Sequence, residues 1–317
     1  MFKPQLRRAR DALRDALRLD QAQRVSVTTG SPDDAKVLTG RLLAHTMRNQ
    51  GPVTRLCDAG FKVFSQFDDD GIIQYLIDNV EAPVPEIFVE FGVEDYQESN
   101  TRFLLVNNNW SGLIMDGNPA NIQFVQGTDM YWRHDLRARA AFITAENINS
   151  VLAAEQVQGE VGVLSIDIDG NDYWVWNAVQ VVDPVIVVVE YNSLFGATAP
   201  VAVPYAPGFM RQQAHWSCQY WGAGIGAFCH LAEKKNYSFV GCNGAGNNAY
   251  FVKTSRLGRV HPHSPSSGYA ARKFRDARAP DGKLTFLGHS QSRALIEDMP
   301  LVNVVTGGKT SLKSLGA

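Results

Sequence analysis

The stretches EIFVEFGVEDYQESNTRFLL (86–105) and VGVLSIDIDGNDYWVW (161–176) decide the fold of this chain. Each begins as a short, continuously apolar run and ends in acidic residues. WSGLIMDGNP (110–119) and VIVVVEYN (185–192) repeat the pattern. Runs that are apolar on both faces are typical of parallel strands buried between helices. The acidic residues then mark the carboxyl edge of the sheet, where open α/β sheets bind their ligands.

We expect strands at 87–92, 112–116, 140–144, 161–167 and 185–191, because helical segments alternate with these apolar runs. Near the end of the domain, YSFVGC (237–242) and AYFVK (249–253) flank the turn-prone NGAGNN and predict a hairpin. The chain is therefore predicted to fold as a doubly wound α/β domain, with helices on both faces of a mostly parallel sheet.

Three further segments flank or interrupt this domain. Residues 1–50 are predicted to form a helical extension, since leucines recur near helical spacing with arginines between them. Residues 51–254 make up the main domain, and within it 193–226, rich in Pro, Gly and aromatic residues, is expected to be a substrate loop or lid. Residues 255–317 are expected to form a C-terminal arm.

Composition excludes several classes of protein. The net charge of −2 gives no reason to expect a nucleic-acid partner, and no apolar run is long enough to span a membrane. Residues 1–24 lack the apolar centre of a secretory signal, and the four cysteines include no CxxC pair, so we expect a cytoplasmic protein with reduced thiols. The spacing of the nearby histidines and cysteines matches no zinc motif, so buried thiols are the preferred interpretation over a zinc site at His215, Cys218, Cys229, His230 and Cys242.

The loop after the first strand argues against a dinucleotide cofactor. VEFGVEDYQES (89–99) has one glycine, Gly92, where the dinucleotide fingerprint needs three, and Glu94 and Asp95 would repel a pyrophosphate. A cationic cofactor without phosphates, such as S-adenosylmethionine, would instead be attracted. Asp116 closes the second strand, where a carboxylate can accept hydrogen bonds from both ribose hydroxyls. The alternative is that Glu90 and Asp116 are merely capped or ion-paired strand-end carboxylates.

Over roughly residues 61–253, the segments FSQFDDDGII (64–73), VEFGVEDYQESNTRFLL, WSGLIMDGNP and SIDIDGNDYWVW resemble the FkbM-like branch of class I S-adenosylmethionine-dependent methyltransferases. The resemblance implies a Rossmann-like, seven-stranded, mostly parallel sheet with an antiparallel last strand. This chain departs from the family in its glycine-poor loop after Gly92. The cofactor-binding residues that the resemblance implies are Gln66, Glu90, Gly92, Asn100, Thr101 and Asp116. We add Gly117 and Asp167, which follow the second and fourth strands.

A second acidic cluster follows the fourth and fifth strands. Asp167 and Asp169 are two residues apart and so share one side of an extended strand, and Glu190 and Asn192 end the neighbouring strand. Carboxylate and amide oxygens suit Mg²⁺, which acidifies a hydroxyl, and the arrangement is similar to that of metal-dependent O-methyltransferases. We therefore predict that Asp167 and Asp169 act in catalysis and that all four residues form a metal site. The alternative is that these groups cap helices and bind backbone amides.

The loop 193–226 supplies the remaining candidates. His215 has a pKa suited to a general base near neutral pH. Aromatic side chains can stack on the apolar face of a sugar, although they also commonly cover a core. The aromatic residues that we predict to contact substrate are Tyr191, Tyr205, Trp216, Tyr220 and Trp221.

These features together predict O-methylation of a sugar or oligosaccharide hydroxyl with S-adenosylmethionine and Mg²⁺, in polysaccharide biosynthesis. Within sugar enzymes, the chain is similar to the O-methyltransferases of mycobacterial methylated polysaccharides. Two alternatives stay open: methylation of an antibiotic or other secondary metabolite, and a non-catalytic module that binds the cofactor for assembly. A homo-oligomer is also compatible with the sequence.

Overall fold

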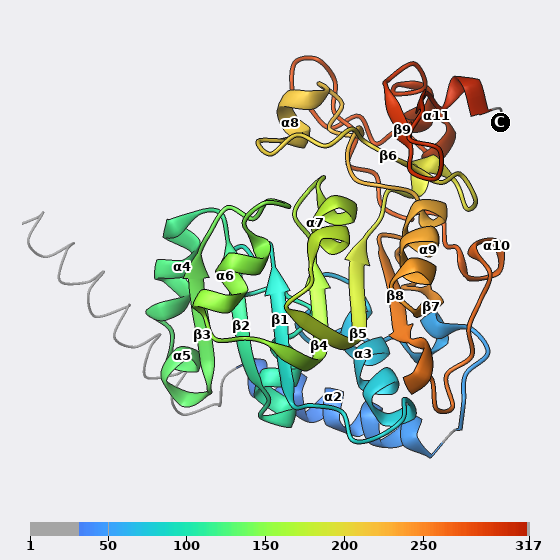
Figure 1. Ribbon diagram of the computed structural model, residues 1–317. Helices are drawn as coiled ribbons and strands as arrows, with labels where there is room; N and C mark the ends of the chain where they lie inside the picture. Colours follow the sequence, from blue (N-terminus) through green and yellow to red (C-terminus); the bar gives the residue numbers. More distant parts are fainter. Residues whose placement is uncertain (1–31, 50, 316–317) are drawn as a thin grey trace, which may run out of the picture.

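The computed structural model describes residues 32–49 and 51–315 (Figure 1). Most of the predicted helical extension lies outside these residues; its described part is helix α2 (Pro32–Arg48). Among the described residues, no helix combines the length and hydropathy required of a membrane-crossing segment. The four cysteines are free thiols, and Cys218, Cys229 and Cys242 are buried.

A seven-stranded sheet with strand order β3-β2-β1-β4-β5-β8-β7 forms the centre of the molecule. The first five strands in this order pair in parallel, and β8 runs antiparallel to both of its neighbours. This is the predicted doubly wound, Rossmann-like sheet, mostly parallel and with an antiparallel last strand. The strands are β1 (Ile87–Phe91), β2 (Ser111–Asp116), β3 (Leu136–Ala140), β4 (Gly159–Ile166), β5 (Val182–Glu190), β7 (Tyr237–Cys242) and β8 (Asn248–Lys253).

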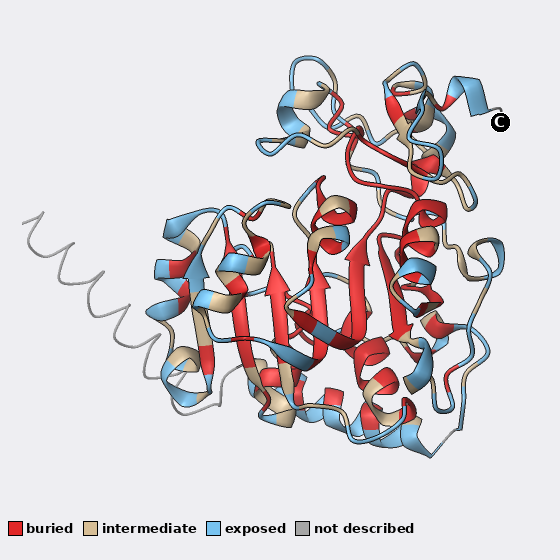
Figure 2. Ribbon diagram, viewed as in Figure 1, coloured by how far each residue is buried: buried red, intermediate tan, exposed pale blue. Residues whose placement is uncertain are grey.

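Alternate residues of each central strand face two separate apolar cores, as buried parallel strands require. On one face, Val89, Leu164 and Val187 pack with helices α6, α7 and α9; on the other, Phe88 and Val163 pack with α3. Figure 2 shows the central strands buried along their length. The helices are α3 (Asp69–Asn79), α4 (Pro119–Gln126), α5 (Asp129–Arg133), α6 (Ile148–Ala154), α7 (Asp172–Ala178) and α9 (Ile225–Lys234).

The third strand lies four residues earlier than predicted. Residues 140–144 were expected to be a strand because they are apolar, but β3 is Leu136–Ala140, with arginines at 137 and 139. An edge strand pairs on one side only and tolerates exposed charge, so its sequence lacks the apolar signal. Ile143 instead enters the core after the strand has ended, and Phe142 is 54% exposed.

The loop 193–226 and the C-terminal arm fold together beyond the carboxyl ends of the strands (Figure 1). Strand β6 (Val201–Ala202) of the loop pairs with β9 (Leu301–Asn303) of the arm, and β9 pairs with β10 (Lys309–Thr310). Leu194, Tyr220 and Ile296 contribute to a shared apolar core. We call this assembly the upper unit. Its helices are α8 (Arg211–Ala214) and α11 (His289–Ala294), while α10 (Pro265–Gly268) lies beside β7.

Candidate active site

A cavity of about 510 Å³ opens at the carboxyl edge of the sheet, between the strand ends and the upper unit. It lies at the ends of the paired strands β1 and β4, where the chain continues from β1 toward β2 on one side and from β4 toward β5 on the other, the position at which α/β folds of this type bind ligands. The predicted site residues that line it are Gln66, Glu90, Gly92, Asn100, Asp116, Gly117, Asp167, Asp169 and Glu190.

The turn after β1 requires a glycine. Gly92 has φ +75°, and a Cβ atom there would lie 1.5 Å from the carbonyl oxygen of Asp167. The rest of this loop contains no glycine, and Glu94 and Tyr96 adopt left-handed conformations themselves. The buried Tyr96 hydroxyl lies 2.9 Å from the Thr101 hydroxyl, which helps to hold this strained loop in place.

Glu90 anchors the segment that follows this loop. Its buried carboxylate accepts hydrogen bonds from the backbone N–H groups of Asn100 and Thr101 and from the hydroxyls of Ser99 and Thr101. Burial raises the pKa of Glu90, and these hydrogen bonds oppose the rise. Thr101 itself is fully buried and does not line the cavity, so it supports the cavity wall through Glu90 and would not contact a bound cofactor.

Asp116 lies at the end of β2 with its carboxylate held in one orientation. One oxygen accepts hydrogen bonds from Asn118 N (2.8 Å) and Asn121 Nδ2 (3.0 Å), and the other from Glu94 N (2.9 Å). Oδ1 has both of its lone pairs used, whereas Oδ2 retains capacity for one further donor. Asp116 therefore ties the β1 loop to the β2 loop and still offers one acceptor to the cavity. Gly117 beside it lies under Phe142.

Three carboxylates converge on the opposite side of the cavity. Asp167, Asp169 and Glu190 can each place one oxygen within 4.8 Å of the others. Burial raises the pKa of Asp167 and of Glu190 well above the usual range, and the charge of neighbouring acids raises both further. The two buried groups are close enough to share a proton. Burial also raises the pKa of Asp172 to about 7, although Ile168 N and Gly170 N donate hydrogen bonds to it.

One further observation, an unpartnered carboxylate oxygen, indicates that this cluster could hold a divalent cation. Glu190 Oε2 is buried and has no hydrogen-bond partner within the described part of the chain, so an oxygen ligand is left available. Asn192 does not join the cluster. Its Nδ2 donates to the carbonyl oxygens of Gln219 and Trp221, and its Oδ1 accepts from Leu194 N. The predicted metal ligand Asn192 is therefore a helix cap, and the metal set reduces to three carboxylates.

Arg211, which the sequence did not single out, provides a positive charge beside these acids. It begins α8, and its guanidinium lies 2.9 Å from Asp169 Oδ1 and 5.9 Å from the centre of the Trp221 ring. Asp169 adopts a left-handed conformation (φ +58°) that directs the turn toward α8. The ion pair thus connects the upper unit to the β4 loop across the cavity.

Two loops that are distant in sequence complete the wall. Phe67 and Phe274 stack with ring centres 5.7 Å apart, and both line the cavity. Phe274 belongs to the arm, so the arm reaches the site as well as the loop 193–226. Glu94, whose charge argued against a dinucleotide, also lines the cavity. Other lining residues that the sequence analysis missed are Phe142, Phe209, Asn247, Asn248 and Asp276.

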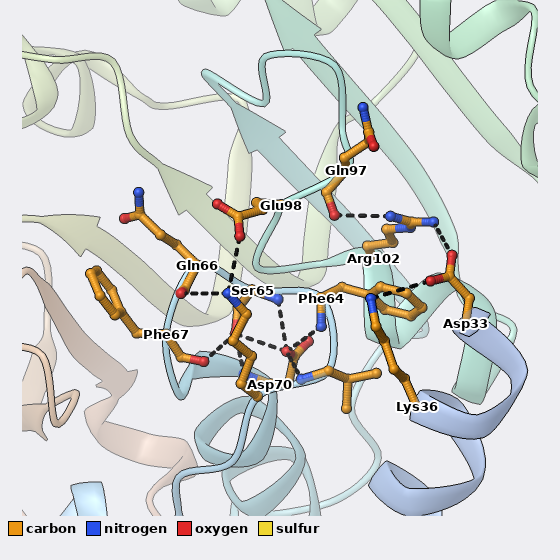
Figure 3. A network of polar contacts seen from close by, with 12 residues as sticks. Asp33, Lys36, Phe64, Ser65, Gln66, Phe67, Asp70, Gln97, Glu98 and Arg102 are labelled. Carbon is orange, nitrogen blue, oxygen red and sulfur yellow. Dashed lines mark hydrogen bonds and ion pairs between the residues drawn. The ribbon is translucent and has the colours of Figure 1, made fainter.

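The loop that carries Gln66 and Phe67 is held by a buried aspartate (Figure 3). Asp70 Oδ2 accepts hydrogen bonds from the backbone N–H groups of residues 63, 64 and 65, each at 2.7 Å, and from the Ser65 hydroxyl at 2.8 Å. Lys62 joins the Gln66 carbonyl oxygen to Glu98. The helix dipole at the start of α3, where Asp70 lies, adds to the stability of this carboxylate.

His215 is not placed to act as a base. It does not line the cavity; its Nδ1 lies 2.7 Å from the Ser217 hydroxyl, and its ring packs against Trp216 with centres 4.9 Å apart. Burial lowers its pKa. The zinc alternative also fails. Within residues 32–49 and 51–315, no cluster of ligand atoms is formed by His215, Cys218, Cys229, His230 and Cys242.

Four of the five aromatic residues predicted to contact substrate are buried in the protein interior or bonded to residues outside the cavity. The Tyr191 hydroxyl donates to Ala270 O and that of Tyr220 to Pro300 O, and Trp221 is buried. The Tyr205 hydroxyl donates to Glu146, away from the cavity. Trp216 is 43% exposed and lines a neighbouring cleft. The alternative interpretation, that aromatic residues cover a core, therefore holds for Tyr191, Tyr220 and Trp221.

No family model matches the chain, and no curated protein matches it. Similar solved structures include an O-methyltransferase from Bacillus cereus in complex with S-adenosylhomocysteine (13% identity, TM-score 0.36, 77% of this chain and 91% of that one). The N-terminal domain of EvdMO1 with S-adenosylhomocysteine bound (12%, 0.37, 70% and 97%) and the CurJ carbon methyltransferase (12%, 0.38, 75% and 70%) are others. At these identities and TM-scores, the matches carry no argument about activity or substrate.

Proposed function

We propose that this protein is an S-adenosylmethionine-dependent methyltransferase that methylates a hydroxyl group. One observation carries the proposal: the cavity at the carboxyl edge is lined by many carboxylates and one arginine, Arg211. A pyrophosphate would be repelled there, whereas the sulfonium and ammonium groups of this cofactor are attracted. Asp116 would accept a hydrogen bond from a ribose hydroxyl through Oδ2, and Gly92 would lie beside the cofactor where the β1 loop meets the β4 loop.

The chemistry requires an acceptor oxygen held in line with the methyl group and a group that takes its proton. When bound, S-adenosylmethionine supplies a methyl carbon activated by the sulfonium. The cofactor would donate that carbon to the acceptor oxygen and leave as S-adenosylhomocysteine, and the acceptor proton would pass to the Asp167–Glu190 pair. Burial raises the pKa of both carboxylates, which favours their taking up a proton.

Mg²⁺ is part of the proposal because Asp167, Asp169 and Glu190 fit it. The ion would acidify the acceptor hydroxyl. Removing divalent ions with EDTA is expected to lower turnover at least tenfold, with recovery on adding Mg²⁺, while binding of S-adenosylhomocysteine persists. Glu190→Gln should abolish the Mg²⁺ response. Full activity after EDTA treatment would rule out the metal and leave the carboxylate pair as the base.

We further propose a sugar or oligosaccharide acceptor and a role in polysaccharide biosynthesis in the cytoplasm. The similarity to the O-methyltransferases of mycobacterial methylated polysaccharides supports the sugar acceptor. Calorimetry with S-adenosylmethionine and S-adenosylhomocysteine tests the cofactor, with Asp116→Ala expected to weaken binding at least tenfold. Transfer of a labelled methyl group to panels of sugars and of macrolides then tests the acceptor. Labelling of macrolides alone would favour the secondary-metabolite alternative, and binding without any turnover would favour the assembly module. Absence of cofactor binding would refute the proposal as a whole.

A further inference from the structure

A second cleft, of about 430 Å³, opens beside the active-site cavity. Arg211 and Asp276 line both spaces, so the two are adjoining. The far side of the second cleft is formed by Gln212, Trp216, Arg278 and the turn 279–282. The predicted substrate residue Trp216, which does not reach the first cavity, thus lies in a space that continues from it.

The walls of this second cleft are held together by specific contacts between the loop 193–226 and the arm. Arg278 N donates to Ser217 O (3.1 Å), and Gln219 Nε2 donates to Asp276 Oδ1 (3.1 Å). Arg272, which is buried, holds the same Asp276 oxygen at 3.0 Å. The cleft is therefore a formed surface of the upper unit, with its polar groups in fixed positions.

Trp216 offers a flat apolar surface in this cleft. His215 packs against its ring and is itself fixed by Ser217, so the indole is oriented although it is 43% exposed. Around it lie the side-chain amide of Gln212, the guanidinium of Arg278 and the carboxylate of Asp276. Asp169 pairs with Arg211, Asp276 pairs with the buried Arg272, and the Arg278 guanidinium donates to the Gly282 carbonyl oxygen. An apolar plane among hydrogen-bonding groups matches a sugar ring, which has C–H faces and hydroxyls.

The sizes of the two spaces point the same way. A nucleoside cofactor with an amino-acid tail would fill much of a 510 Å³ cavity and leave limited room beside Asp167 and Glu190 for an acceptor. The second cleft, reached past Arg211 and Asp276, offers space for the remainder of a longer acceptor.

We propose that the acceptor is an oligosaccharide of at least two rings, with the methylated ring at Asp167 and Glu190 and a neighbouring ring on Trp216. The inference rests on the proposed function and narrows its acceptor to an extended carbohydrate. Trp216 is then a specificity-determining residue for acceptor length, and His215 is a positioning residue for Trp216.

The test compares methyl glycosides of glucose, mannose and galactose with the matching trisaccharides. Acceptor binding is measured on the enzyme with S-adenosylhomocysteine bound, and turnover is measured with S-adenosylmethionine. We expect the wild type to favour a trisaccharide over its monosaccharide at least tenfold in kcat/KM. Trp216→Ala should raise the KM for the trisaccharide about tenfold with kcat and cofactor affinity unchanged, and leave monosaccharide kinetics as they are. Trp216→Phe should restore most of the loss.

Trp132→Ala is the matched control, because Trp132 is 71% exposed on α5 and lines neither space. Equal kcat/KM for mono- and trisaccharides, or an equal effect of Trp216→Ala on both, would overturn the second subsite while leaving the methyltransferase proposal standing. If the cofactor binds but no saccharide binds or reacts, the sugar acceptor and this inference fall together. Calorimetry with S-adenosylhomocysteine shows separately whether the cofactor binds, so failure of cofactor binding is distinguished from these two outcomes.

Discussion

At the scale of single residues, the buried acids of this protein are held by unequal numbers of hydrogen bonds. Asp69, which begins α3, is fully buried, and its Oδ1 accepts hydrogen bonds from Asn243 Nδ2, Asn248 Nδ2 and the Tyr250 hydroxyl. Its Oδ2 has no partner within the described residues. Burial raises the pKa of Asp69 to about 6 despite these three donors.

This arrangement predicts that Asp69→Asn stabilises the protein above pH 6. The folded state binds a proton more tightly than the unfolded state, so the free energy of unfolding of the wild type falls as pH rises from about 4 to about 6. Asparagine keeps an oxygen for the three donors and places its amide where Oδ2 lacks a partner. We expect equal stability near pH 4 and a gain on the order of 2–3 kcal/mol at pH 7.

Urea unfolding at a series of pH values measures the effect, with the exposed Asp129→Asn as a control that should show no such trend. A wild-type stability that rises between pH 4 and pH 6 relative to Asp69→Asn would contradict the assigned direction of the pKa shift.

Single-residue patterns in the sequence predicted some orientations and could have predicted others. Glu190 and Tyr191 are consecutive, and side chains alternate along a strand, so only one of them can face the cavity. Glu190 does, and Tyr191 is buried on the other side. Alternation would have excluded Tyr191 as a substrate contact once Glu190 was chosen. No such rule reveals that the side chain of Asn192 is used to cap a helix, because that depends on where the carbonyls of Gln219 and Trp221 lie.

At the scale of elements, the central strands were predictable and the edge was not. The expected bounds of β1, β2 and β4 agree with the structure to within two residues, because burial on both faces demands continuous apolar sequence. β3 was misplaced since an edge strand can be LRARA. β6, β9 and β10 are two or three residues long and were not predicted at all; strands this short have no periodicity to detect.

The segment 61–70 shows how one side chain can define an element that has no regular structure. Asp70→Ala would leave the buried N–H groups of residues 63, 64 and 65 without their shared acceptor, at a cost of about 3 kcal/mol or more of unfolding free energy. Gln66 and Phe67 would lose their fixed position at the cavity. We expect binding of S-adenosylhomocysteine to weaken at least tenfold, as measured by calorimetry.

Asp78→Ala, on the same helix, provides the comparison. Asp78 pairs with Arg48 near the surface, and such pairs contribute at most about 1 kcal/mol. It should therefore change stability little and cofactor affinity not at all. Hydrogen exchange should show faster amides at 63–65 in Asp70→Ala only; unchanged exchange there would mean that the loop is held by other contacts.

At the scale of the whole molecule, the predictable half of the site is the half built by the sheet. The acids at 116, 167 and 190 follow apolar strands, and the parallel topology alone brings them to one edge. Arg211, Phe274 and Asp276 come from segments whose path is set by tertiary packing in the upper unit, about 20 to 90 residues beyond Glu190. Local sequence carries no signal for such a meeting, since neither periodicity nor a motif marks those residues.

The packing of the upper unit predicts that its two segments unfold together. Leu301 in β9 is 1% exposed in the core that joins the loop 193–226 to the arm, so Leu301→Ala should cost that unit about 2–5 kcal/mol. Because β6 pairs with β9 and Arg211 reaches the cavity from the same unit, hydrogen exchange should accelerate in both 193–222 and 295–312, while the amides of β1, β4 and β5 keep their protection.

The KM for the acceptor should rise more than the dissociation constant of S-adenosylhomocysteine, which is bound mainly by the sheet edge. Val305→Ala, exposed on the same segment, is the control. Acceleration confined to the arm would show that the loop folds independently of it.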